Sequence, residues 1–196
     1  MRKHFLPDPF HPLGTYRRPA RVQAHTRAFL VLSHAEVESY LEEWAKDVMR
    51  ASQDAWTTSR RITAPLAYLL SSSDSRLRIP GTFAEVRSSD THDRLVETCT
   101  KLFQTYYEMI GANHGVKERN LLDLFGPLGV PEHALGTTLL PNLEDFGKRR
   151  GVHAHRSVRS VASTLDPETE HKRVVELLTD LLPLDGWLVA CKRRLR

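Results

Sequence analysis

Cysteine is scarce in this sequence, and long apolar runs are missing. The two cysteines, Cys99 and Cys191, lack metal-ligand spacing, and each falls in an amphipathic pattern where a small apolar side chain is the ordinary interpretation. We therefore assign neither a redox role. The apolar run at residues 28–32 is far too short to cross a bilayer, which takes about 20 residues, and no early apolar run resembles a signal peptide. These absences favour a folded cytoplasmic protein without a membrane partner.

The regular alternation of apolar and polar residues that marks a β-strand is also missing. No stretch alternates at period two for long enough to form a sheet, and no internal repeat is visible. The 196 residues suffice for one sizeable core, and 40% of them are apolar and 27% charged, as is usual for a globular protein. The sequence predicts an all-α fold: a single up-and-down helical bundle over residues 21–196, with an irregular insertion between main helices, after a proline-rich irregular arm at residues 1–20.

The sequence instead shows helical periodicity. Apolar residues recur at steps of three and four over several segments, and capping residues mark their ends. Asp166 followed by Pro167 is a strong helix start, and Pro183 is expected to stop that helix. The four principal helices are expected at about 21–55, 89–111, from near 138 onward, and 166–183, with shorter helices near 62–70, 117–125 and 187–191 and a loop at 71–90.

Positive charge is unevenly distributed along the chain. The formal net charge is +4 and the isoelectric point is near 9.2. Basic residues gather at 2–27, 148–159 and 192–196, and such clusters attract polyanions. Basic chain ends are commonly just solvated. The middle cluster differs because histidines lie inside it.

The segment 148–156, Lys-Arg-Arg-Gly-Val-His-Ala-His-Arg, combines these residue types at an informative spacing. Four residues separate Arg150 from His155, which places them about 140° apart around a helix, yet the long guanidinium arm can reach a pocket shared with the imidazole. Arginine offers a fork of donors to phosphate oxygens, and histidine exchanges protons near pH 7. Together they suit phosphodiester cleavage. On composition alone, a solvated helix face is the more frequent origin of such a cluster.

This arrangement resembles the HEPN superfamily, helical bundles marked by an arginine, four residues and a histidine, often with alanine before the histidine, as Ala154 stands here. The runs at 30–43, 115–121 and 126–130 resemble its RiboL-PSP-HEPN branch, so the similarity extends over roughly 25–190. The resemblance implies a metal-independent endoribonuclease without a cofactor, in which the 2′-hydroxyl attacks the adjacent phosphate. Arg150 would hold the phosphate and stabilise charge in the transition state, and His155 would move the proton.

The resemblance further implies partners. Family members usually form a homodimer whose two motifs face one composite cleft, and cleavage of RNA in a toxin or antiviral defence system calls for restraint by an antitoxin or another regulatory protein. Two positions depart from the family: Gly151 stands where many active members carry Asn, Asp or His, and Ser157 replaces the tyrosine of a nucleotidyl-modified subset. The alternative is therefore a non-catalytic HEPN module that binds RNA or nucleotide, or scaffolds a partner. A plain helical dimerisation protein is a third interpretation.

Neighbouring residues supply secondary candidates. Arg149 and His153 are four apart and can lie together on a helix, so these two and Arg156 are expected to support RNA binding, although a solvent-facing histidine is equally compatible with the pattern. Glu36 and Glu38 adjoin a histidine on the long helix and are candidates to orient an active-site residue, with a charged outer face as the alternative. The spacing of the histidines does not favour a metal site.

Overall fold

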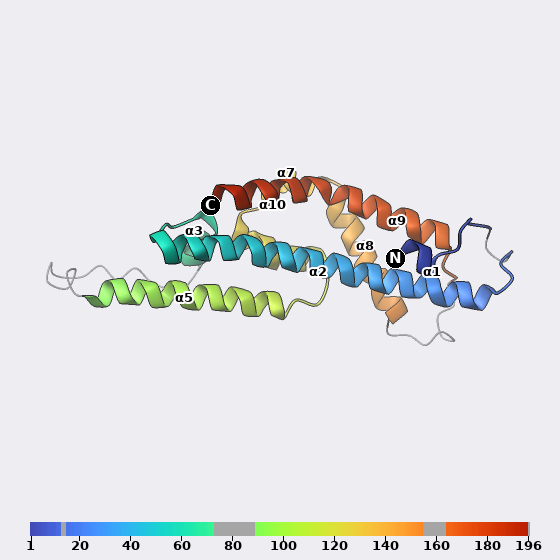
Figure 1. Cartoon of the computed structure of the whole chain (residues 1–196), viewed down its shortest axis with the longest axis horizontal. Coiled ribbons are helices and arrows are strands. Elements are labelled where there is room, and N and C mark those ends of the chain that lie inside the picture. The colour runs from blue at the N-terminus through green and yellow to red at the C-terminus, as the bar shows by residue number, and fades with distance from the viewer. Residues whose placement is uncertain (13–14, 73–88, 155–163, 196) are drawn as a thin grey trace. The chain divides into compact units, whose positions relative to one another are not determined.

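The computed structural model describes residues 1–12, 15–72, 89–154 and 164–195 (Figure 1). Every regular element within these ranges is a helix, which confirms the predicted all-α class. None of the described helices is long and apolar enough to cross a membrane. The elements are α1 (Arg2–Phe5), α2 (Pro19–Ser59), α3 (Ala64–Ser72), α5 (Ser89–Gly111), α6 (Glu118–Phe125), the 3-10 helix η1 (Gly126–Leu128), α7 (Glu132–Leu135), α8 (Leu139–Ala154), α9 (Pro167–Asp180) and α10 (Leu182–Leu195).

The long helix α2 extends beyond its predicted range at both ends. It begins at Pro19, whose fixed φ suits a first helical turn. It ends before Arg60, which adopts the left-handed conformation with φ 55° and donates its backbone N–H to the carbonyl of Trp56. Its buried side chains recur at the three- and four-residue steps seen in the sequence, and they include Phe29, Leu30, Val37, Leu41, Ala45, Val48 and Met49.

The chain divides into two compact units, each assembled from separate stretches of sequence. Unit 1 contains Met1–Leu41, His114–Leu121 and Pro131–Trp187. Unit 2 contains Glu42–Asn113, Leu122–Val130 and Leu188–Arg196. The motif arginine and the elements around it belong to unit 1.

Unit 2 has its core along α5, whose bounds agree with the predicted 89–111. Cys99, Phe103, Tyr106 and Ile110 are buried on one face, and the Tyr106 hydroxyl donates to the backbone carbonyl of Leu124. Burial raises the pKa of the Cys99 thiol, which suits a packing residue rather than a nucleophile.

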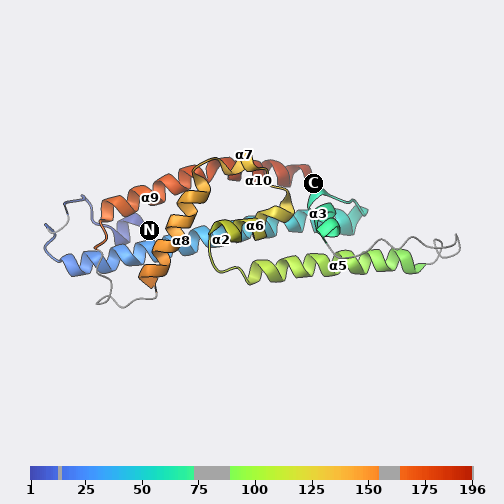
Figure 2. The same ribbon diagram turned by 180° about the vertical axis from the view of Figure 1, so that it is seen from behind.

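Unit 1 places α8 against both α2 and α9, and α8 runs across the direction of α2 in both views of the ribbon (Figures 1 and 2). Leu139, Leu143 and Phe146 form the buried face of α8. Asp166 caps α9 as predicted, because its carboxylate accepts the backbone N–H of Thr169 at 2.9 Å. These contacts hold α8 between α2 and α9.

Two expectations from local sequence need correction. Pro183 does not stop the helix that begins at Asp166: α9 ends at Asp180, and Pro183 lies in the first turn of α10, where a missing N–H costs nothing. The arm at residues 1–20 is not wholly irregular, because it contains α1 and the start of α2. Leu6, which follows α1, is buried and anchors this segment.

Candidate nucleic-acid interface

The motif arginine lies near the carboxyl end of α8. Arg150 is half-buried, and the helix continues through Gly151 as far as Ala154, so the glycine does not end it. His155 and Arg156, the predicted proton-transfer residue and a predicted supporting residue, lie outside the described residues.

His34 of α2 lies close enough to Arg150 for the arginine's charge to act on its imidazole. Its side chain is only 2% exposed and stacks on Phe146 of α8, with ring centroids 5.4 Å apart. Burial, together with the positive charge of Arg150, lowers the pKa of His34 to about 4. The imidazole is therefore neutral at pH 7. Its position makes it a candidate site residue whose importance the sequence pattern did not reveal.

The two predicted orienting carboxylates have different surroundings. Glu38 lies one turn after His34, and its Oε2 is 3.5 Å from His34 Nδ1, which has no hydrogen-bond partner within the described ranges. Glu36 is exposed and lines a separate groove. Helix geometry explains the difference, because residues four apart share a face whereas residues two apart do not. Of the two carboxylates, Glu38 is the one that lies beside His34.

The arginine beside Arg150 has a different role. Arg149 donates a guanidinium hydrogen bond to Oε1 of Glu170 on α9, and Arg173 binds the same oxygen at 3.1 Å. Glu170 is almost fully buried; burial raises its pKa, and the two arginines act in the opposite direction. Arg149 is thus engaged in joining α8 to α9. Arg150, by contrast, forms neither a hydrogen bond nor an ion pair within the described parts of the chain.

Arg27 and Arg149 lie close enough to His153 for their charges to act on it, and all three have buried nitrogen atoms without hydrogen-bond partners among the described residues. Burial lowers the pKa of His153, and the positive charges of Arg27 and Arg149 add to this effect. Within the described structure the unpartnered atoms include His153 Nδ1, Arg149 Nε, and Nε and Nη1 of Arg27. Buried donors normally have acceptors, and an anion is the ligand that would satisfy guanidinium donors. Arg27 is a member of this group that the motif alone did not indicate.

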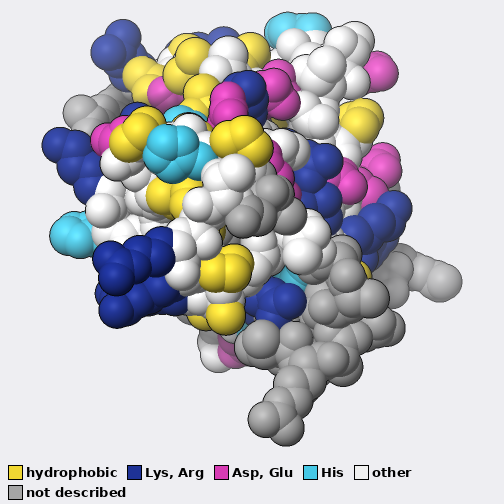
Figure 3. All heavy atoms as spheres, turned by 90° about the vertical axis from the view of Figure 1, so that its right-hand side faces the viewer, with side chains coloured by type: hydrophobic (Ala, Val, Ile, Leu, Met, Phe, Trp, Pro, Cys, Tyr) yellow, Lys and Arg dark blue, Asp and Glu magenta, His cyan; other side chains and the backbone are white. Residues whose placement is uncertain are grey.

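The surface of unit 1 carries further positive charge. Seen from the end at which α2 and α9 begin, Lys and Arg side chains gather in several groups, with histidines exposed among them (Figure 3). Such a surface attracts phosphate-bearing ligands through long-range electrostatics.

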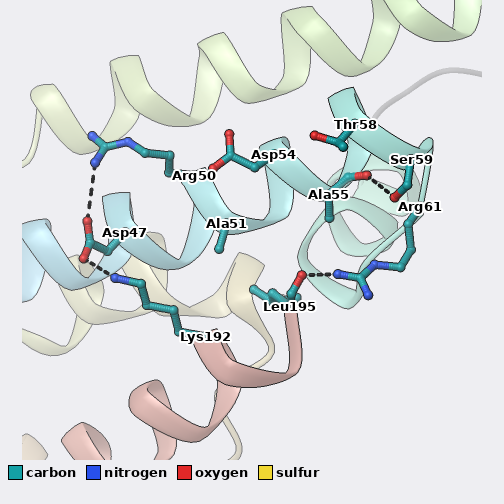
Figure 4. A pocket seen from close by; sticks show the side chains of 10 residues that line it. All are labelled: Asp47, Arg50, Ala51, Asp54, Ala55, Thr58, Ser59, Arg61, Lys192 and Leu195. Atoms are coloured by element: carbon teal, nitrogen blue, oxygen red, sulfur yellow. Dashed lines mark hydrogen bonds and ion pairs between the residues drawn. The ribbon is translucent and has the colours of Figure 1, made fainter.

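A charged cavity of about 510 Å³ in unit 2 is a weaker candidate site (Figure 4). Its charges pair with one another: Asp47 accepts from Lys192 at 2.6 Å and lies 3.5 Å from Arg50. Arg61 donates to the backbone carbonyl of Leu195 and so caps α10. These pairings occupy the lysine and arginine donors that would otherwise bind an anion.

The described residues include no group of three or more His, Cys, Asp or Glu side chains that could hold a metal ion. No family model, no curated protein and no solved structure matches this chain.

Proposed function

We propose that this protein is a metal-independent endoribonuclease of a toxin or antiviral defence system, acting in a dimeric cleft with Arg150 and His155. The observation that carries the proposal is the cationic site at the end of α8. There Arg150 has no carboxylate partner among the residues that the structure describes, whereas its neighbour Arg149 is paired with Glu170. The resemblance of the sequence motif to HEPN nucleases supplies the reaction.

In the proposed reaction the 2′-oxygen of one nucleotide forms a bond to the adjacent phosphorus, and the bond from phosphorus to the 5′-oxygen breaks. The 2′-hydroxyl gives up a proton, and the departing 5′-oxygen receives one. His155 moves a proton in this exchange, and Arg150 stabilises the negative charge that builds on the phosphate. The products are a 2′,3′-cyclic phosphate and a 5′-hydroxyl.

We assign His34 a positioning role in this scheme. Because its imidazole is neutral, His34 lies near Arg150 without competing for the phosphate as a second cation. Arg27 and Arg149 have buried guanidinium donors without partners among the described residues, and both act on His153, which favours a ligand with several anionic oxygens over a single carboxylate.

The decisive experiment measures RNA cleavage by the purified protein in excess EDTA. Wild type should cut, whereas Arg150→Ala and His155→Ala should lose turnover by a factor of about 100 or more. Lys148→Ala is the matched control: Lys148 is on the same helix, exposed, and paired with Glu144 at 3.3 Å, so its removal should leave cleavage nearly unchanged.

Product analysis sharpens the test. The upstream fragment should end in a cyclic phosphate, and a substrate with one 2′-deoxy position at the cut site should resist. Activity that vanishes in chelator and returns with magnesium, or DNA cut as readily as RNA, would assign the chemistry to another mechanism.

A second candidate function is favoured by Gly151, which stands where many active HEPN members have a polar side chain. In this alternative the cationic site binds RNA or nucleotide without cutting it. Arg150→Ala would then weaken RNA binding, while neither wild type nor His155→Ala would cleave. Binding and cleavage assays on the same three proteins separate the two functions.

A further inference from the structure

A mostly apolar groove of about 470 Å³ opens in unit 1, away from the cationic site. One side comes from α2 and the other from the end of α9 and the start of α10. Its lining residues are Glu36, Val37, Tyr40, Leu178, Leu181, Leu182 and Asp185.

The apolar surface continues beyond the groove along α9. Val175, Leu178 and Leu182 are 47%, 51% and 65% exposed, and their three- and four-residue spacing places them on one side. The opposite side of α9 buries Val174 and Leu177 in the core. Single exposed leucines are ordinary, but a helix that is apolar on two sides has a second surface to cover.

The charge of the groove indicates what covers it. In a chain with a net charge of +4, its lining contains two carboxylates and neither lysine nor arginine. The Tyr40 hydroxyl donates to Asp185 Oδ1 at 2.5 Å, which fixes one carboxylate beside the apolar floor. Glu36 is exposed on α2 and supplies the other. A complementary ligand combines apolar side chains with flanking cations.

We propose that this groove docks an amphipathic helix of a partner protein, with leucine-like side chains at i, i+3, i+4 and i+7 and Lys or Arg at the edges. Leu178 and Leu182 form the apolar contact, and Glu36 and Asp185 attract the flanking cations. Because the stripe extends to Val175, outside the lining, an elongated helix covers the surface better than a small molecule. The inference holds whether or not the protein cuts RNA.

The test titrates the full-length protein with a fluorescent synthetic peptide of about 18 residues, five helical turns, bearing leucines on one face and lysines beside them. Wild type should bind saturably, and Leu178→Ser and Leu182→Ser should each weaken binding about tenfold through lost apolar burial. Leu122→Ser is the matched control, because Leu122 is a similarly exposed leucine (55%) in unit 2. A scrambled peptide with its leucines spread around the helix should bind poorly.

A charge exchange identifies the cation contact. Glu36→Lys should weaken the lysine peptide and strengthen a peptide with glutamate in place of lysine. Equal binding of the scrambled peptide, absence of saturation, or an equal loss in Leu122→Ser would overturn the proposal. So would light scattering in which wild type self-associates, Leu178→Ser is monomeric and the peptide does not bind, because the groove would then be an interface between copies.

Discussion

His34 is the residue whose chemistry depends most on its surroundings. In the sequence it is one of ten histidines, next to two glutamates on an amphipathic helix. In the fold it is buried against Phe146 and close to a guanidinium, so its protonated form is disfavoured twice. Stability should therefore depend on pH through this one side chain.

The pKa of His34 is about 4 in the folded protein and 6.5 in an unfolded chain, so the unfolded state binds the proton more readily. The contribution of the neutral His34 side chain to the free energy of unfolding is fully present above about pH 6.5, and it is lost as pH falls toward 4. Urea unfolding of wild type and His34→Gln at pH 7 and 4.5 should show their difference in unfolding free energy changing by about 2 kcal/mol, in the direction that disfavours wild type at low pH. A difference that stays constant over this range would contradict a buried neutral imidazole.

At the scale of elements, the polar contact between α8 and α9 depends on one carboxylate. Glu170 holds Arg149 from α8 and Arg173 from its own helix, and no other carboxylate in the described structure forms an ion pair with either arginine. The contact between Glu170 and Arg149 helps to position the end of α8, and with it Arg150, in unit 1.

Glu170→Ala should lower the free energy of unfolding by about 2 to 3 kcal/mol, because it leaves two arginines unpaired. The loss is smaller than for a fully buried pair because both arginines are partly exposed. Glu176→Ala, an exposed position on the same helix, should change stability by less than about 0.5 kcal/mol. Equal effects of the two substitutions in urea unfolding would show that Glu170 does not stabilise the contact between α8 and α9.

The cap of α9 is a separate contribution. Asp166→Ala removes the acceptor for the backbone N–H of Thr169 and should cost about 1 kcal/mol in the same measurement. Asp166→Asn keeps a side-chain oxygen and should recover most of the loss. An equal loss in both variants would assign the effect to charge rather than to capping.

At the scale of the whole molecule, the proposed mechanism needs two chains. Light scattering at micromolar concentration should give a mass near twice 22.4 kDa. RNA affinity should fall steeply with salt, and Arg150→Ala should flatten the slope of log affinity against log salt by about one unit for the lost phosphate contact. A monomer would contradict the composite cleft, and an unchanged slope would remove Arg150 from the RNA site.

Local sequence patterns were sufficient for several helices and for the position of Arg150 on one of them. The apolar period of α5 and the Asp166-Pro167 start of α9 depend on residues within a turn or two of each other, so they can be read along the chain. The position of Arg150 near the end of α8 follows from the same signals. Pro183 shows the limit of that reading, because a proline that ends one helix and a proline that begins the next look alike in sequence.

Only the tertiary structure brought His34 to Arg150 and Glu170 to Arg149. His34 of α2 packs on Phe146 of α8, more than a hundred residues later in the sequence, which brings it near Arg150. No local period records which faces of two helices meet. Burial then decided the chemistry: the same histidine or glutamate has an ordinary pKa in water and a shifted one between packed helices. The residue types were visible in the chain, but their pairing and protonation depend on contacts that exist only after the helices pack.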